Sequence, residues 1–110
     1  MRYEESLHYA VDKPFLVLYG QEQYRGAFLK AAVLIEAIIR GHPFTDGNKR
    51  TGYLSGITLL ELLSGVTVEA GGDEIVEVCL SVEAEMMSAE GLAGWMFEHS
   101  EPIVDMFGDW

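Results

Sequence analysis

Basic residues are scarce in this sequence. Lys and Arg together number 7 against 18 Asp and Glu, which gives a formal net charge of -11. A protein that binds nucleic acid needs a basic surface that neutralises the phosphates. The composition therefore argues against direct binding to nucleic acid, and an acidic surface favours basic partners instead.

Cysteine and long apolar runs are also nearly missing. The single cysteine, Cys79, cannot form a disulfide within the chain, and its apolar-periodic surroundings are typical of a small buried side chain in a reducing compartment. The most apolar run, from Gly52 to Leu63, contains Glu61 and is shorter than the roughly 20 residues of a membrane-spanning helix. The first residues are polar and mixed in charge, unlike a secretory signal peptide. We therefore expect a cytoplasmic protein with no membrane partner.

The length and composition of the sequence are those of one folded domain. The chain has 110 residues, of which 49% are hydrophobic, so it can form one core but is too short for two. We expect a single domain over residues 1–110. Its last part, residues 100–110, is an acidic tail with scattered aromatics, to which the pattern assigns no element.

Apolar residues recur mostly with the periodicity of helices, which predicts an all-α fold, a compact helical bundle. A short extended flap is expected near residues 14–20, because an apolar run there ends at Gly20; a buried connector would fit the same run. The expected helices are residues 4–11, 23–40, 46–64, a segment after Gly71-Gly72-Asp73 with Ile75, Cys79, Val82 and Met86 on one face, and a segment capped by Ser88 with Leu92, Trp95 and Met96 on one face.

The helix that ends near Ser64 is expected at the centre of the bundle. It is apolar on nearly all sides, as a helix surrounded by others is. Gly52 and Gly56 lie one turn apart and would let a neighbouring helix approach closely. In contrast, Glu83, Glu85 and Glu90 are most simply a solvated acidic face.

The stretch HPFTDGNKRT, residues 42–51, places two adjacent cations at the expected start of this central helix. A helix start offers unpaired N–H groups and the positive end of the helix dipole, which together bind anions. The N–H groups of residues 47–50 can point at phosphate oxygens. Arg50 can hold a phosphate with two hydrogen bonds, and Lys49 can add a point charge.

Two further groups at this helix start indicate transfer chemistry. Asp46 has the wrong sign for a phosphate site, unless Mg2+ lies between its carboxylate and the phosphates. His42 is the group of this loop that can remove a proton near neutral pH. A base, a metal-binding carboxylate and an anion site together predict nucleotide-dependent transfer to a hydroxyl.

Each part of this stretch also has a simpler interpretation. Asp46-Gly47-Asn48 alone is more often a turn and a helix cap, His42 a solvated histidine, and Lys49-Arg50 a solvated face. Their order, directly before a buried helix, favours the functional interpretation.

The same ten residues resemble the signature of the Fic/Doc family. The lysine at position 49 resembles the Doc branch of the family, the toxins of toxin–antitoxin modules. AMP-transferring Fic members usually have glycine at this position. Those members usually also carry a second arginine where this chain has Tyr53. The likeness covers about residues 5–97, although the N-terminus looks short for the family.

The resemblance implies a role for each residue of the motif. His42, Asp46 and Arg50 would be catalytic. His42 would activate the target hydroxyl, Asp46 would hold Mg2+, and Arg50 would bind phosphate. The anion hole would be formed by Gly47, Asn48 and Lys49.

The resemblance also implies an activity. Doc-type proteins are similar to kinases that transfer the γ-phosphate of ATP to a threonine of elongation factor Tu, which arrests translation, and an antitoxin inhibits them in trans. Two alternatives stay open: a Fic-like AMP transferase, and a truncated member that binds a nucleotide or a partner without turnover.

Overall fold

The structure, a computed structural model, describes residues 2–103. Residues 104–110 of the expected acidic tail lie outside this range. The described part is mostly helical, with two small antiparallel sheets, which confirms the helical fold class. The elements in chain order are α1 (Arg2–Asp12), a 3₁₀ turn (Lys13–Phe15), β1 (Val17–Leu18), β2 (Gln21–Glu22), α2 (Ala27–Gly41), α3 (Asn48–Ser64), β3 (Val66–Val68), α4 (Gly72–Glu83), α5 (Ala89–Glu98) and β4 (Ser100–Pro102).

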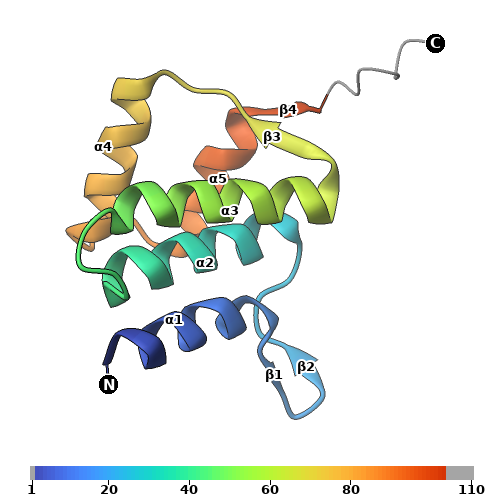
Figure 1. The fold of residues 1–110 in the computed structure, drawn as a ribbon. Coiled ribbons are helices and arrows are strands. Elements are labelled where there is room, and N and C mark those ends of the chain that lie inside the picture. Colours follow the sequence, from blue (N-terminus) through green and yellow to red (C-terminus); the bar gives the residue numbers. More distant parts are fainter. Residues whose placement is uncertain (1, 104–110) are drawn as a thin grey trace.

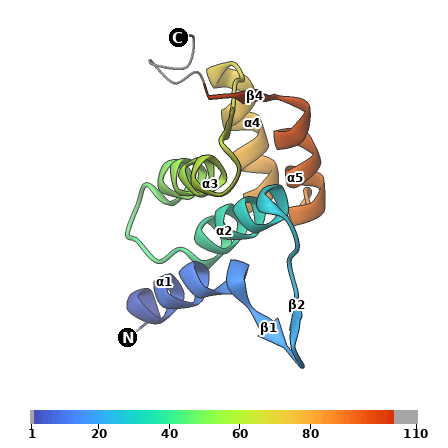
Figure 2. The same cartoon turned by 90° about the vertical axis from the view of Figure 1, so that its right-hand side faces the viewer.

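The centre of the bundle is α2, not α3 as the sequence pattern predicts. Figures 1 and 2 show α2 between α1 on one side and α3, α4 and α5 on the other. Most of its residues are buried, from Lys30 to Ile39 with the exception of Glu36. In contrast, α3 buries one face on α2 and leaves Leu54 and Leu62 exposed on the other. The expectation was wrong because apolar residues on all sides of a helix do not show which of those sides a neighbour covers.

The contact between α2 and α3 depends on two glycines, as their spacing predicts. A Cβ atom at Gly56 would lie 2.2 Å from Cγ1 of Ile35 and 3.0 Å from the carbonyl oxygen of Ala31. At Gly52 a Cβ would lie 3.1 Å from a side-chain carbon of Ile39. The backbones of the two helices therefore approach each other so closely that larger residues at these positions would collide with α2.

The segment expected as a flap forms an exposed hairpin. Strands β1 and β2 pair antiparallel, Val17 with Glu22, around a turn at Tyr19 and Gly20 in which both residues have positive φ. All strand residues are exposed, so the alternative of a buried connector is wrong. The next helix begins at Ala27 and not at residue 23, because residues 21–22 belong to this hairpin.

Two other features differ from the expected pattern. Helix α4 ends at Glu83, and Glu85 has a φ of 61°, which ends the helical path. Met86 therefore lies outside α4 and is exposed, not on its apolar face. The last described segment forms β4, which pairs with β3 in the register Thr67 with Glu101. The Ser88 cap is confirmed, since its hydroxyl accepts a hydrogen bond from the Gly91 N–H at 3.0 Å.

The glycine contact gives a direct test of the packing. Gly56→Ala should lower the free energy of unfolding by about 1–3 kcal/mol, the usual cost of excess volume in a packed core. Gly94→Ala is the matched control in α5, because a Cβ there meets no atom within 4 Å. It should leave stability unchanged or raise it by up to about 1 kcal/mol. Equal effects of the two variants in urea denaturation would contradict the packing described.

Candidate active site

The motif residues lie in the loop between α2 and α3 and in the first turn of α3. His42 ends α2 with a φ of 47°, in the left-handed region, and Gly47 precedes α3 with a φ of 74°. Pro43 is buried, and Phe44 packs against the residues that α1 and α2 bury between them. The loop is therefore anchored to the core through its apolar residues, while its polar residues remain at the surface.

Asn48 fixes the shape of this loop from inside. Its side chain is buried, its Oδ1 accepts a hydrogen bond from the Phe44 N–H at 3.0 Å, and its Nδ2 donates to the Phe44 carbonyl at 3.0 Å. The same Nδ2 lies 3.4 Å from Nδ1 of His42. The Asn48 side chain is thus occupied within the loop, which leaves its backbone N–H for an anion.

The contact with Asn48 affects how His42 could act as a base. An amide nitrogen can only donate, so Nδ1 of His42 is the acceptor and a neutral ring then carries its proton on Nε2. A base needs a nitrogen without a proton. At 3.4 Å the contact is long for a hydrogen bond, so the ring can leave Asn48 at little cost and expose a free nitrogen to a substrate.

The start of α3 leaves several backbone N–H groups without a partner in the helix. No side chain caps it, and the Thr51 N–H makes the first helical hydrogen bond, to the Gly47 carbonyl at 2.9 Å. The N–H groups of residues 48–50 consequently have no acceptor within the helix. Asp46 and Arg50 are exposed beside them, and in residues 2–103 neither side chain has a hydrogen-bond or ion-pair partner.

Lys49 is placed differently from Arg50. Its Nζ lies 3.3 Å from Oε2 and 3.4 Å from Oε1 of Glu83, the last residue of α4. The sequence interpretation missed this pair, because it treated Glu83 as part of a solvated acidic face. His42 and Asp46 thus lie in the loop and Arg50 in the first turn of α3, whereas Lys49 pairs with a neighbouring helix.

A cleft of about 780 Å³ extends from the motif between α3 and α4. Residues 46–50 form its polar end, and the other end is apolar, with Leu54 of α3 and Val76 of α4 among its lining residues. Its size is within the range of pockets for small ligands. The apolar end also includes Tyr53, Ile75 and Cys79.

Two buried groups of this cleft are kept neutral by their surroundings. Burial, with smaller contributions from Cys79 and two glutamates, raises the pKa of Tyr53 to about 12. The Tyr53 hydroxyl has no hydrogen-bond partner within the described part of the chain. Burial also raises the pKa of the Cys79 thiol, which agrees with its interpretation as a small buried side chain. Burial thus disfavours the charged form of both groups.

The donor groups of the loop fit one kind of metal site. Across residues 2–103 no group of three or more His, Cys, Asp or Glu side chains could hold a metal by itself. Mg2+ is usually bound by one or two carboxylates together with phosphate oxygens and water. Asp46, a carboxylate without a partner among residues 2–103 and next to the uncapped start of α3, fits this pattern.

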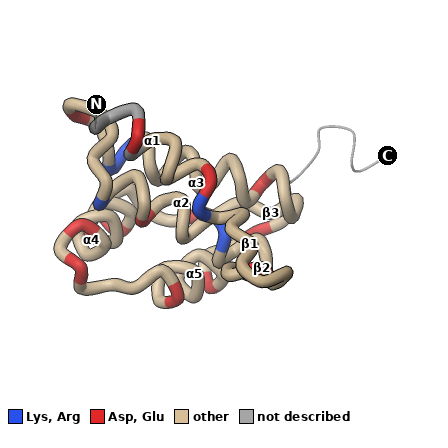
Figure 3. Tube along the Cα trace, turned by 90° about the horizontal axis from the view of Figure 1, so that it is seen from below, with Lys and Arg blue, Asp and Glu red and all other residues tan. Residues whose placement is uncertain are grey.

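Acidic positions outnumber basic ones on the described part of the chain. Figure 3 shows Asp and Glu positions on several elements, including α4 and α5, whereas Lys and Arg are few. Arg50 is therefore one of few cations that can attract an anion. No helix of the described residues is long and apolar enough to span a membrane.

Asn48 gives a prediction for the loop. Asn48→Ala removes the partners of the Phe44 N–H and carbonyl, so it should lower the free energy of unfolding by about 1–3 kcal/mol. Thr45→Ala in the same loop is the control; Thr45 is exposed, and its change should stay within about 0.5 kcal/mol. Urea denaturation measures both. A loss from Asn48→Ala no larger than that from Thr45→Ala would contradict the role given to Asn48.

Comparison with known proteins gives two matches. The model of the family described as Fic/DOC family matches residues 1–60. The chain is also 38% identical over 64 residues to a protein named Toxin Doc from Mycolicibacterium smegmatis, a match that covers 58% of this chain and 48% of the relative. The chain thus spans about half the length of the curated relative. The family match ends before α4 and α5, short of the expected residue 97, and no solved structure matched.

Proposed function

Because the chain belongs to the Fic/DOC family, we propose that it is a Doc-like toxin that transfers the γ-phosphate of ATP to a hydroxyl of a protein. One observation carries this proposal. The uncapped start of α3 lies beside Asp46 and Arg50, whose side chains have no partner among residues 2–103, and the loop that leads into this helix holds His42.

The start of α3 supplies the phosphate site. Its free N–H groups and helix dipole favour an anion, and Gly47, which has no side chain, lets a phosphate approach the backbone. Arg50 binds two phosphate oxygens with its planar guanidinium. Asp46 holds Mg2+, which offsets the negative charge of the phosphates.

His42 supplies the base. The oxygen of the target hydroxyl bonds to the γ-phosphorus, the bond from that phosphorus to the bridging oxygen breaks, and ADP leaves. The proton of the hydroxyl goes to the free nitrogen of His42. Such proton transfer typically contributes 10²–10⁴-fold to a rate.

Two residues favour phosphate transfer over AMP transfer. Lys49 changes the room and charge around the anion hole, so ATP can bind with its terminal phosphate there. Tyr53, a neutral group, stands where AMP-transferring members usually carry arginine. A threonine of elongation factor Tu is the proposed target, and the name of the relative, a toxin, favours an antitoxin that acts in trans.

Two other functions have specific support. A Fic-like AMP transferase would use the same His42, Asp46 and Arg50. A member that binds nucleotide without turnover would use the uncapped start of α3 alone.

Labelled ATP distinguishes these functions. The protein is incubated with Mg2+ and a bacterial lysate, once with label in the γ-phosphate and once in the α-phosphate. We expect a labelled protein near the size of elongation factor Tu with the γ-label alone. Label from the α-phosphate alone would instead establish AMP transfer.

The same assay tests His42. His42→Ala should reduce labelling at least 100-fold, the lower end of a catalytic base's contribution, while His8→Ala, an exposed residue of α1, should leave it unchanged. Equal labelling by the wild type and His42→Ala would refute the role of His42, and no label in any sample would favour the non-catalytic alternative.

A further inference from the structure

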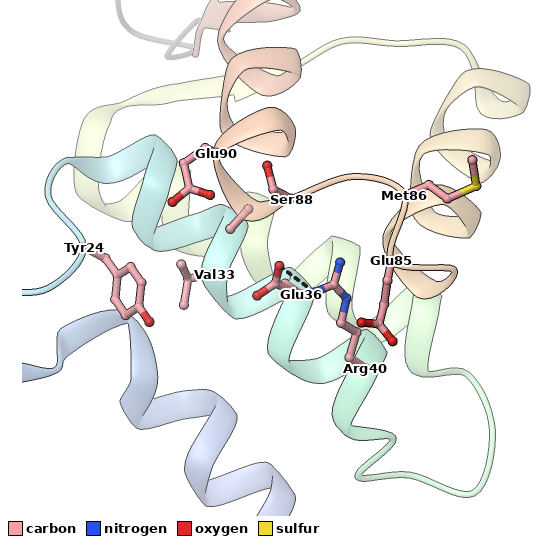
Figure 4. Close-up of a pocket in the computed structure, with 9 residues that line it drawn as sticks. Tyr24, Val33, Glu36, Arg40, Glu85, Met86, Ser88 and Glu90 are labelled. Carbon is pink, nitrogen blue, oxygen red and sulfur yellow. Dashed lines mark ion pairs between the residues drawn. The ribbon is translucent and has the colours of Figure 1, made fainter.

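The C-terminal end of α4 is bonded to the last turn of α2 by Arg40, two residues before His42. Its Nε donates to the Val82 carbonyl and its Nη2 to the Met87 carbonyl, both at 2.9 Å. The Val82 carbonyl also accepts a hydrogen bond from the Glu85 N–H at 3.1 Å, so Arg40 adds a second donor at the end of α4. Figure 4 shows the Arg40 side chain reaching from α2 toward the α4–α5 connection.

Each of the three nitrogens of the Arg40 guanidinium already has a partner within the protein. Its third contact is an ion pair with Glu36, 3.1 Å from Nη1, drawn as a dashed line in Figure 4. The pocket around it, about 610 Å³, is also lined by Glu85 and Glu90. An anion would meet carboxylates there and a guanidinium already bonded to three acceptors, so the contacts of Arg40 indicate a role in holding α4.

The residue that follows Val82 is Glu83, the partner of Lys49. Their side chains are 34% and 42% exposed, and an ion pair this accessible to water is weak by itself. Its geometry depends on whether the end of α4 stays in place. Arg40 holds that end through the backbone immediately before Glu83.

We propose that Arg40 is a positioning residue for phosphate binding, which keeps Glu83 against Lys49 and so keeps the Lys49 ammonium paired with α4. This inference rests on the proposed function, since it concerns the same anion site. While the pair is intact, Arg50 is the cation of the motif that is free to bind phosphate. Release of Lys49 adds a second mobile cation beside the start of α3, so anion affinity rises.

Binding of inorganic tripolyphosphate to the full chain, measured by calorimetry, tests this inference. Glu83→Gln and Arg40→Gln should each bind it two- to fivefold more tightly, the range that the strength of an exposed ion pair allows. In a Lys49→Ala background both gains should disappear, because they act through Lys49. A purely structural role of Arg40 would weaken binding, and to the same degree in either background.

Two controls separate charge from position. Glu85→Gln removes a nearby exposed carboxylate that does not contact Lys49 and should leave affinity unchanged. Glu36→Gln combined with Arg40→Gln preserves the local net charge and should show the same gain as Arg40→Gln alone. If Arg40→Gln does not fold, Glu83→Gln with and without Lys49→Ala still tests whether release of Lys49 raises the affinity for tripolyphosphate.

The outcomes also separate this inference from the proposed function. No binding to the wild type, or binding that Arg50→Ala leaves intact, overturns both. Two other results overturn the positioning role alone, provided that binding depends on Arg50. In the first, Glu83→Gln does not strengthen binding; in the second, it strengthens binding equally in the Lys49→Ala background.

Discussion

The close packing of α3 on α2 is the constraint on which the candidate site depends. Gly52 and Gly56 place no side chain of α3 in this contact, so the backbone of α3 lies against Ile35 and Ile39 of α2. This contact sets how α2 and α3 lie against each other. The loop that joins them is held by the Asn48 side chain and by Phe44, which packs on the core.

The cations of the site have different tasks although they are adjacent in sequence. Arg50 is exposed and has no partner in the part of the chain that the structure describes, whereas Lys49 is paired with α4. Arg40 bonds the same end of α4 to α2. In a chain of net charge -11, the placement of each cation strongly affects anion binding. The structure thus connects α2, α3 and α4 at one end of the bundle through charged side chains.

The exposed hairpin lies away from this end. It leads into the first residue of α2, whereas His42 follows the last, and the 15 residues of α2 span about 22 Å. A target peptide added as a strand to β1 or β2 would therefore lie far from the base unless the hairpin moves. A target that binds at the loop between α2 and α3, or at the cleft between α3 and α4, would lie closer to the proposed base than one bound at the hairpin.

Local features were predictable from the sequence, and contacts between distant segments were not. The helix starts at Asn48 and after Ser88, and the close approach at Gly56, follow from neighbouring residues and their spacing. The central position of α2 and the pairing of β3 with β4 depend on which faces meet, which the apolar pattern of one segment does not contain. The pair of Lys49 with Glu83 joins residues 34 positions apart, so no local signal indicates it.

The central claim is that the start of α3 binds the phosphates of a nucleotide. NMR titration of the labelled protein with ATP and Mg2+ tests it most directly, because each backbone N–H reports its own surroundings. The account predicts saturable shifts that are largest for the N–H groups of residues 47–50 and absent from the hairpin at residues 17–22. Shifts concentrated elsewhere, with residues 47–50 unchanged, would contradict it.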